Sequence, residues 1–361
     1  MSLRVLAIEP YYGGSHRAFL DGLVRHSRHE WTCVGLPPRK WKWRMRGAAL
    51  SVARQLDQPF DLLFLSDFLD LACLVGLRPR RLADVPKVVY FHENQLTYPV
   101  QHESERDYQY GFTNITTCLA ADRVLFNSAF HRGEFLEAVA GLLGRMPDCV
   151  PEGVPEAIAE RSEVLPLGID LSTLDVDEPP TREGPALIVW NHRWEYDKNP
   201  EAFFTAMFDL AEEHRPFRLA VAGQSFRREP VIFDVARRRL ADRIEHFGYL
   251  ESRADYARLL HKADIAVSTA HHEFFGIAAV EALYCRCFPL LPDKLTYPEI
   301  LPAEYHERHL YRDPPDLLGR LRDAIAHLEA TRCCDLRHLA ERFGWPALIA
   351  RYDDVLEDAA R

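Results

Sequence analysis

The sequence predicts an α/β protein of two domains, each built as a doubly wound parallel sheet. Short apolar runs alternate with helix-length segments along the whole chain, which is the pattern of a parallel sheet covered by helices. The chain has 361 residues, whereas a typical domain has about 150. A polar stretch with three prolines, residues 175–185, interrupts the alternation near the middle of the chain, and such a stretch cannot continue a helix or a central strand.

The expected strands are compact apolar runs of the kind that is buried on both faces of a sheet. In the first half they are residues 4–8, 31–34, 62–65, 88–91, 123–126 and 163–167, with helices at 17–26, 48–56, 107–120 and 132–143. In the second half the strands are residues 186–190, 218–222, 244–247, 264–268 and 288–291.

These elements define the expected domains. The first covers residues 1–172 and the second residues 186–340, with a linker at 173–185. Residues 341–361 hold a C-terminal helix that could cross back to the first domain, because apolar residues recur in it at helical spacing. Two doubly wound domains in succession imply a cleft between them, since such sheets bind ligands at the carboxyl ends of their strands.

Composition narrows the class of protein. Hydrophobic residues make up 47% of the chain and charged residues 27%, which suffices for two cores and argues against bulk disorder. We expect no membrane span, signal peptide or disulfide framework, because no apolar run is long enough and the eight cysteines form no C-x-x-C pair. The expected location is therefore the cytoplasm. The net charge of −10 argues against non-specific coating of nucleic acid but allows a local basic patch.

The first candidate site follows the first expected strand, in the string Tyr-Tyr-Gly-Gly-Ser-His of residues 11–16. Paired glycines let the backbone approach a ligand closely, and the helix that follows offers free N–H groups to an anion. An ordinary strand-to-helix turn is the alternative. The string is not G-x-G-x-x-G and no acidic residue closes the second strand, which disfavours a nicotinamide-binding site.

A second polar string, His92-Glu93-Asn94-Gln95, stands at the carboxyl end of an expected buried strand. Open α/β sheets bind their ligands at this position. A solvated loop is the alternative reading of the string.

The third string, residues 191–200, stands at the end of the first strand of the second domain and contains Arg193 and Lys198. The guanidinium of an arginine can form two parallel hydrogen bonds to phosphate oxygens, and the ammonium of a lysine neutralises their charge. The two side chains together therefore suit a diphosphate. A solvated charged loop is again the alternative.

The fourth string, residues 272–282, has two carboxylates eight residues apart, Glu273 and Glu281, with Gly276 between them. A helix that begins near Gly276 would place its N-terminus between the carboxylates. This arrangement offers acceptors for hydroxyl groups and a positive dipole end for phosphates. It does not match a zinc helix, because the second histidine of His-Glu-x-x-His is absent, and we do not read it as an acid–base pair.

A fifth string has five cations and two tryptophans in the eight residues 39–46. Basic side chains interleaved with stacking rings are the composition of a loop that contacts RNA. The alternative is a basic amphipathic edge whose tryptophans pack into the core. The candidate RNA-binding residues are Arg39, Lys40, Trp41, Lys42, Trp43 and Arg44.

These strings together resemble a known family. The two halves, the pair Arg193 and Lys198 and the spacing of Glu273 and Glu281 resemble the retaining, nucleotide-sugar-dependent glycosyltransferases of the GT-B fold. The strings at residues 12–16, 91–95 and 192–198 are similar to those of the tRNA-queuosine mannosyltransferases. The resemblance covers nearly the whole chain and implies two Rossmann-like domains that face each other across a cleft.

The resemblance also implies roles for individual residues. Arg193 and Lys198 match the diphosphate-binding pair, Glu273 the carboxylate that holds the donor hexose, and Glu281 the one that holds the nucleotide ribose. His92 matches a position beside the reacting sugar. The donor would further contact Gly13, Gly14, Ser15, Gly223, Tyr249, Gly276 and Ile277. The acceptor side would use His16, Asn94 and Gln95.

The activity implied by the resemblance is transfer of mannose from GDP-mannose, with retention, to the cyclopentenediol of queuosine at the wobble position of the tRNA-Asp anticodon. No metal, no other cofactor and no obligatory protein partner are expected. One alternative is a GT-B transferase with a glycan, lipid or small-metabolite acceptor, and another is a nucleotide-sugar epimerase. A tRNA-binding protein with a vestigial sugar-nucleotide site is the non-enzymatic alternative.

Overall fold

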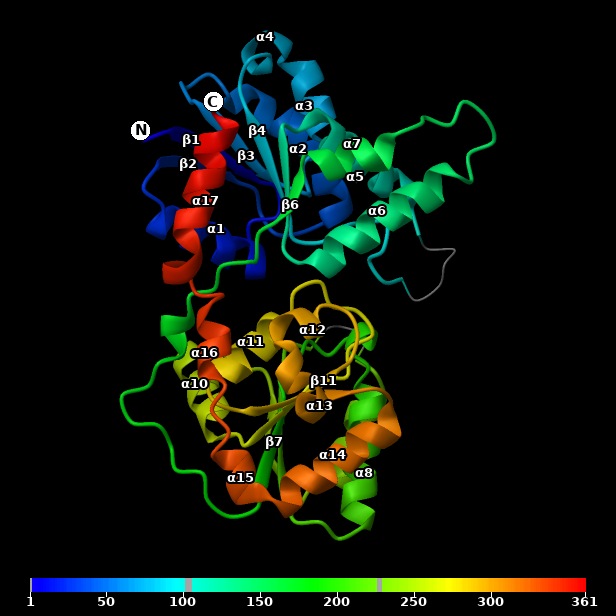
Figure 1. Cartoon of the computed structure of the whole chain (residues 1–361), viewed down its shortest axis with the longest axis vertical. Coiled ribbons are helices and arrows are strands. Elements are labelled where there is room, and N and C mark those ends of the chain that lie inside the picture. The colour runs from blue at the N-terminus through cyan, green and yellow to red at the C-terminus, as the bar shows by residue number, and fades with distance from the viewer. Residues whose placement is uncertain (1, 101–105, 226–228) are drawn as a thin grey trace. The chain divides into compact units, whose positions relative to one another are not determined.

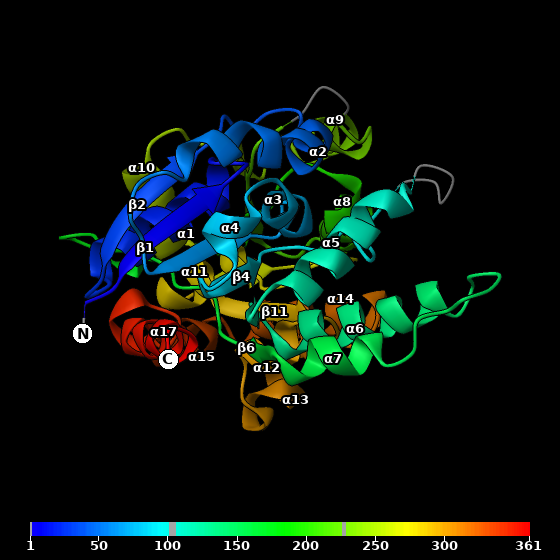
Figure 2. The same cartoon turned by 90° about the horizontal axis from the view of Figure 1, so that it is seen from above.

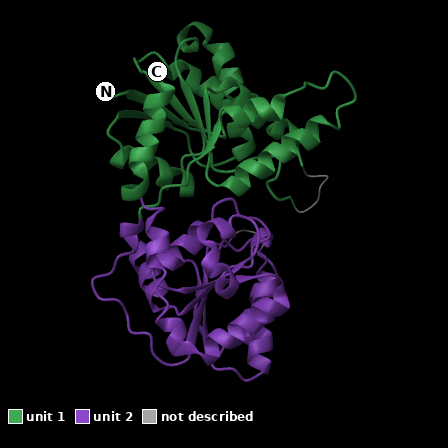
Figure 3. Cartoon of the chain, viewed as in Figure 1, with its two compact units in different colours: residues 1–170, 345–361 green, residues 171–344 purple. Residues whose placement is uncertain are grey.

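The computed structural model describes residues 2–100, 106–225 and 229–361 and has the predicted α/β class (Figure 1). The chain divides into two compact units (Figure 3). Unit 1 comprises Met1–Asp170 and Trp345–Arg361, and unit 2 comprises Leu171–Gly344. Among the described residues, no helix combines the length and the apolar character that a bilayer crossing requires.

Unit 1 holds a six-stranded parallel sheet in the order β2-β1-β3-β4-β5-β6. The strands are β1 (Arg4–Glu9), β2 (Glu30–Gly35), β3 (Leu62–Ser66), β4 (Lys87–Phe91), β5 (Arg123–Phe126) and β6 (Ser162–Val164). The helices are α1 (Gly14–His26), α2 (Trp41–Val52), α3 (Leu71–Leu77), α4 (Pro79–Leu82), α5 (Tyr108–Ala120), α6 (Ala129–Leu143), α7 (Val154–Glu160) and α17 (Trp345–Ala359), with the 3-10 turn η1 (Ala53–Gln55). Helices α6 and α7 run side by side (Figures 1 and 2).

Unit 2 holds a second six-stranded parallel sheet in the order β12-β11-β10-β7-β8-β9. The strands are β7 (Ala186–Trp190), β8 (Phe217–Ala222), β9 (Ile244–Gly248), β10 (Ile265–Val267), β11 (Phe288–Pro292) and β12 (Leu310–Tyr311). The helices are α8 (Pro200–Glu212), α9 (Ile232–Arg239), α10 (Arg253–Lys262), α11 (Ile277–Tyr284), α12 (Tyr297–Ile300), α13 (His306–His309), α14 (Pro314–Ala326), α15 (Leu328–Arg332) and α16 (Arg337–Glu341). The described part of unit 2 also holds the 3-10 turns η3 (Leu171–Leu174), η4 (Tyr196–Lys198) and η5 (Ala303–Tyr305).

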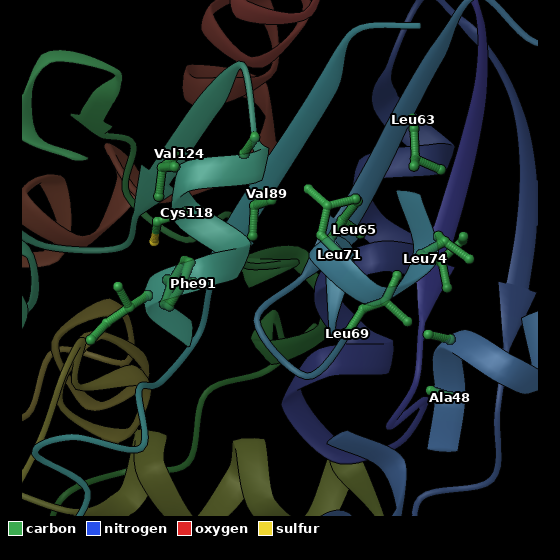
Figure 4. Packing of buried hydrophobic residues seen from close by; sticks show 14 of the residues in the cluster. Ala48, Leu63, Leu65, Leu69, Leu71, Leu74, Val89, Phe91, Cys118 and Val124 are labelled. Atoms are coloured by element: carbon green, nitrogen blue, oxygen red, sulfur yellow. The ribbon is translucent and has the colours of Figure 1, made fainter. Parts of the chain in front are cut away.

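Each unit has its own hydrophobic core. In unit 1, Leu63 and Leu65 of β3 and Val89 and Phe91 of β4 are fully buried and pack with the helices around them (Figure 4). In unit 2, every residue of β7 is fully buried. Strands that are apolar throughout need cover on both faces, and the helices of each unit supply it.

The strand orders place a switch point in each sheet. The chain changes direction between β1 and β3 in unit 1, and between β7 and β10 in unit 2. In open α/β sheets, ligands bind outside the carboxyl ends of the strands at such a point. The segments that follow these four strands are therefore the first places to look for a site.

Two differences from the predicted organisation have a clear physical origin. The helix α2 begins at Trp41, seven residues before the expected start at residue 48, because lysine and arginine interrupt the apolar pattern of its first turn. The segment expected as a linker, residues 173–185, lies in unit 2. Its first two residues end η3, where the Leu174 carbonyl accepts a hydrogen bond from His261 of α10 at 2.9 Å.

Helix α17 is part of unit 1 although it follows unit 2 in the chain, and it lies beside α1 (Figure 1). Its first residue, Trp345, is 1% exposed and packs against Phe19 of α1, with ring centroids 5.6 Å apart. A Cβ atom on Gly22 would lie 2.0 Å from the indole nitrogen of Trp345, and one on Gly168 would lie 2.6 Å from the same ring. The two glycines thus make room for the indole.

We predict that Gly22→Ala destabilises the protein by about 1–3 kcal/mol, because the added methyl group displaces a buried indole from a packed site. Gly133→Ala is the matched control. Gly133 also lies inside a helix, α6, but its added Cβ would meet nothing within 4 Å, and the loss of backbone freedom in the unfolded chain favours folding there. Urea unfolding of both variants measures the difference. Equal stability of the two variants would contradict the packing account.

Candidate functional site

In unit 2 the candidate site is built from the loops after β7 and β10, the strands that flank the switch point. The two loops are joined by hydrogen bonds: the His271 amide donates to the Asp197 carbonyl at 2.8 Å, and the Thr269 side-chain hydroxyl donates to the Lys198 carbonyl at 3.0 Å. Asn199 then starts α8, where its side chain accepts from the Ala202 amide, as an N-cap residue does.

Lys198 is 6% exposed and is surrounded by acceptors. Its ammonium donates to the His272 carbonyl at 2.8 Å and to Glu273 Oε2 at 3.2 Å, and Asp197 Oδ2 lies 3.2 Å away. Burial alone would lower the pKa of Lys198, but the two carboxylates outweigh it and raise the pKa. The ammonium therefore stays charged inside the unit.

The pKa of Glu273 shifts in the opposite direction to that of Lys198. Burial alone would raise its pKa, but the Lys198 ammonium, with smaller contributions from His192 and His272, lowers the pKa to about 2. Both histidines have pKa values lowered to about 4, first by burial and then by the charge of Lys198. Near neutral pH the group thus presents an ionised carboxylate, an ammonium and two neutral imidazoles.

Arg193 comes from the same loop as Lys198, as predicted, but its side chain is 46% exposed and forms an ion pair with Glu195 at 3.1 Å. The two cations therefore differ in setting. Lys198 is fixed by buried partners, and Arg193 keeps a solvent-accessible guanidinium that an anionic ligand can reach.

Glu281, the second predicted carboxylate, lies in α11 and is held by α10. Arg253 donates to its Oε1 at 2.6 Å and the Tyr256 hydroxyl donates to its Oε2 at 2.9 Å. Asn191, at the end of β7, donates to the same Tyr256 oxygen at 2.9 Å. The structure thus connects the carboxylate of α11 to the loop after β7 through Tyr256.

The predicted glycines of unit 2 serve close packing. Gly276 precedes α11 with φ of 90°, and a Cβ there would lie 2.8 Å from Ile300 Cδ1. A Cβ on Gly223 would lie 1.8 Å from the His192 carbonyl oxygen. Only glycine fits either position. Of the other two predicted contacts, Ile277 opens α11 and Tyr249 is 62% exposed after β9.

Unit 1 has its own polar cluster, at the carboxyl ends of β1, β3 and β4. Glu9 Oε2 lies 3.1 Å from His16 Nδ1, and the His16 and His92 rings have centroids 4.1 Å apart. Asp67 Oδ1 accepts from the His92 amide at 2.9 Å. Burial alone would lower the pKa of His16, but Glu9 and the neighbouring acids raise it to about 9. Burial, with the charge of His16, lowers the pKa of His92 well below its usual range.

The other predicted residues of unit 1 lie around this cluster. Gly13 is the extended residue before α1, Gly14 has φ of 55°, and Ser15 is exposed in the first turn. Asn94 is fully buried, and its side-chain oxygen accepts from the amides of Leu96 and Thr97. The Gln95 amide group donates to Glu93 at 2.9 Å. Asn94 therefore shapes its own turn, a role that the sequence reading did not foresee.

The basic string at residues 39–46 is mostly helix, not the loop that its composition suggested. Arg39 and Lys40 precede α2, and Lys40 has φ of 57°. One tryptophan packs into the unit and the other is available for stacking. The rings of Trp41 and Tyr110 have centroids 5.2 Å apart, whereas Trp43 is 59% exposed. Lys42 is exposed, and Arg44 donates to the Pro37 carbonyl at 3.1 Å. The outer face of α2 thus combines cations with one free ring.

Comparison with known proteins decides the family. Residues 4–169 match the family model described as tRNA-queuosine alpha-mannosyltransferase N-terminal, and residues 173–332 match the one described as Glycosyl transferases group 1. The tRNA-queuosine alpha-mannosyltransferase of Drosophila melanogaster is 40% identical over 311 residues, which are 83% of this chain and 82% of the fly protein. The chain belongs to the tRNA-queuosine alpha-mannosyltransferase family.

More distant proteins are similar to a smaller part of this chain, or share only its fold. A GDP-mannose-dependent alpha-(1-6)-phosphatidylinositol dimannoside mannosyltransferase of Mycobacterium tuberculosis is 27% identical over 241 residues, 65% of this chain and 57% of that protein. The solved structure of sucrose-phosphate synthase from Thermosynechococcus elongatus has a TM-score of 0.72 at 15% identity, over 98% of each chain. The fold is GT-B, and the chain is a glycosyltransferase.

Several polar residues of the two candidate sites were not predicted from the sequence. Asp197 and His192 stand in strings already singled out, so their positions could have suggested them. Arg253 and Tyr256 could not be found in this way, because they lie on α10, 28 and 25 residues before Glu281, in a segment without a motif. Glu9 and Asp67 likewise follow apolar strands as single acids.

We predict that the ion pair between Lys198 and Glu273 makes stability depend on acid pH. The pKa of Glu273 is about 2 in the folded protein against an ordinary 4.5. Its contribution is therefore fully present above pH 4.5 and is lost as the pH falls towards 2. In Glu273→Gln the free energy of unfolding should fall less steeply over this range than in the unchanged protein, as measured by urea unfolding at several pH values. Parallel curves for the two proteins would show that the pair does not titrate in this way.

Proposed function

We propose that this chain transfers mannose from GDP-mannose, with retention, to the cyclopentenediol of queuosine at the wobble position of tRNA-Asp. The fly relative is named for mannosyl transfer to tRNA queuosine, and a more distant relative is named as GDP-mannose-dependent. The structural observation that carries the donor half is the buried Lys198 ammonium, 3.2 Å from Glu273, on a loop that also presents the accessible guanidinium of Arg193.

The cations of this loop would bind the donor diphosphate. Arg193 offers parallel N–H donors for phosphate oxygens and Lys198 a compact positive charge. Helix α11 begins at Ile277, just after Gly276, and its N-terminus adds backbone N–H groups and the positive end of a helix dipole. This set of donors can neutralise a diphosphate by itself, so we propose that no metal ion is needed on it.

Glu273 would hold the hexose. A carboxylate with a pKa of about 2 stays ionised at neutral pH and accepts hydrogen bonds from sugar hydroxyls. In the transfer, the bond between the anomeric carbon and the phosphate oxygen breaks while an acceptor oxygen bonds to the same face of that carbon. The acceptor proton goes to the departing phosphate, and Arg193 and Lys198 stabilise the charge that develops there.

The acceptor half of the proposal places the tRNA on unit 1, with the exposed cations and Trp43 at the start of α2 as its contact surface. A tRNA acceptor is consistent with a cytoplasmic reaction. We propose no obligatory protein partner, since the chain has a donor site and a basic surface of its own.

The direct test incubates the purified protein with GDP-mannose and tRNA that contains queuosine, and then analyses the nucleosides by mass spectrometry. We expect a queuosine that is heavier by one hexose. The matched control is the same tRNA with guanosine in place of queuosine, which should gain nothing. Donor turnover without acceptor would instead indicate an epimerase or a hydrolase, and tRNA binding with no product and no thermal shift by GDP would indicate a vestigial site.

Arg193→Ala should lower turnover by about a hundredfold or more, because one preorganised donor to a developing anion is worth about 2.7–4 kcal/mol. Arg258→Ala on α10 is the control, since it also removes an exposed arginine of unit 2 that pairs with an acid. Initial rates of both variants, with thermal unfolding to verify folding, make the comparison. Full activity of a folded Arg193→Ala protein would refute the role given to Arg193.

Charge reversal of Lys40, Lys42 and Arg44 should weaken tRNA binding by about tenfold or more at low salt and flatten its salt dependence, because fewer counterions are released on binding. Trp43→Ala should weaken binding without changing the salt slope. Filter binding or fluorescence anisotropy over a series of salt concentrations measures both effects.

The control for this experiment reverses three other exposed cations of unit 1, which keeps the change in net charge equal. These cations are Arg54, Arg80 and Arg123. If both triple variants lose the same affinity, the effect comes from overall charge, and the start of α2 is not the tRNA surface.

A further inference from the structure

The second carboxylate of unit 2, Glu281, is held by two side chains of α10. Arg253 Nη2 donates to Glu281 Oε1 at 2.6 Å, and the Tyr256 hydroxyl donates to Glu281 Oε2 at 2.9 Å. Glu281 itself is 8% exposed. We propose that Arg253 and Tyr256 are positioning residues, which orient Glu281 so that its two oxygens accept from the two neighbouring hydroxyls of the nucleotide's ribose. This inference rests on the proposed function, because it takes a nucleoside diphosphate sugar as the ligand.

The place of Glu281 on its helix suits a ribose. Glu281 lies four residues after Ile277, which begins α11. Because a helix rises by 1.5 Å per residue, the two Cα atoms lie about 6 Å apart along the axis, and helical side chains lean back towards the N-terminus. A ribose joined to a diphosphate at this N-terminus is therefore within reach of the carboxylate. Since a carboxylate only accepts hydrogen bonds, it suits a group that carries hydroxyls.

The direction of the hydrogen bond from Tyr256 is fixed by Asn191. The side-chain nitrogen of Asn191 lies 3.0 Å from the Ala278 carbonyl oxygen and 2.9 Å from the Tyr256 hydroxyl oxygen. A carbonyl oxygen only accepts, so the Asn191 atom is its NH₂ group, and this group also donates to Tyr256. The hydroxyl proton of Tyr256 is then left for Glu281. Burial and the charge of Glu281 raise the pKa of Tyr256 well above its usual range, so the hydroxyl keeps that proton.

Arg253 is fixed by contacts on several sides. Its Nε donates to Thr173 Oγ1 of η3 at 3.1 Å, while its Nη2 holds Glu281. The guanidinium carbon lies 5.3 Å from the centre of the Tyr256 ring. A group that orients a binding residue has to be held in this way itself. The side chains of α10 therefore form a supporting shell for the carboxylate of α11.

The carboxylate keeps room for a ligand in this arrangement. A carboxylate has about four acceptor positions on its two oxygens. Within the described ranges of the chain, the hydrogen bonds to the Glu281 side chain are one from Arg253 to Oε1 and one from Tyr256 to Oε2. Each oxygen can thus accept again. Two adjacent acceptors match two hydroxyls on neighbouring carbons, as in the 2′,3′-diol of a ribose.

The test measures by calorimetry how tightly the full chain binds GDP and 2′,3′-dideoxy-GDP, which lacks both hydroxyls. We expect the unchanged protein to bind GDP about tenfold or more tightly, because hydrogen bonds to a charged group are strong. This preference should fall below about threefold in Tyr256→Phe and in Arg253→Ala. Arg253→Lys should regain part of it, because its ammonium can still pair with Glu281.

Transfer kinetics provide a second measurement. Tyr256→Phe should raise the KM for GDP-mannose about tenfold and leave kcat within about threefold, because a contact with the ribose is the same in the ground state and the transition state. A fall in kcat with an unchanged KM would contradict the positioning role.

Tyr284→Phe is the matched control. Tyr284 ends α11, and its hydroxyl donates to Asp175 Oδ1 at 3.0 Å, so this variant also removes a bond between a tyrosine and a carboxylate of unit 2. It should keep the full preference for GDP, and thermal unfolding verifies that every variant is folded. A loss of preference in Tyr284→Phe equal to that in Tyr256→Phe would overturn the specific role of Tyr256.

The results separate this inference from the proposed function. The positioning role is wrong if folded Tyr256→Phe and Arg253→Ala keep the preference of the unchanged protein, or if the unchanged protein binds both nucleotides equally well. In both cases GDP still binds, and the proposed function stands. An unchanged protein that binds no GDP would instead overturn the donor half of the proposed function.

Discussion

The site of unit 2 depends on one buried ion pair, between Lys198 and Glu273. A buried ammonium costs several kcal/mol unless it is paired and hydrogen-bonded. Here the His272 carbonyl and two carboxylates satisfy it. Because Lys198 belongs to the loop after β7 and Glu273 to the loop after β10, the pair ties together the two loops that flank the switch point. Removing Lys198 would leave the Glu273 carboxylate without its cation, and removing Glu273 would leave Lys198 with Asp197 as its acidic partner.

Much of the fold could be predicted from local pattern, because the central strands are apolar on both faces. Runs such as β5 (Arg123–Phe126) and β7 (Ala186–Trp190) have the predicted bounds. The short elements could not be found in this way: β12 has two residues and α4 has four, too few for any periodicity. The start of α2 was missed for a different reason, since its first turn is largely cationic and the packing of Trp41 near Tyr110 is a long-range contact.

The candidate sites show the same limit. Lys198 and Glu273 could be found because each stands in a distinctive string at a strand end, but the sequence did not show that they pair with each other. Arg253 contacts Glu281 from another helix, and long-range contacts of this kind leave no local signal. Asn94 was predicted as an acceptor contact because it follows a strand, and the sequence did not show that its side-chain oxygen accepts from the backbone of the next turn. A polar residue at a strand end can serve either purpose, and its hydrogen bonds distinguish them.

The return of α17 to unit 1 has a consequence for synthesis. The ribosome makes unit 1 first, yet the helix that fills the space beside Gly22 and Gly168 is translated after all of unit 2. Until it emerges, the rings of Phe19 and Tyr90, which later face Trp345 and Tyr352, are uncovered. The nascent chain can therefore complete its second unit before its first, and Phe19 and Tyr90 lack these two ring partners for most of its translation.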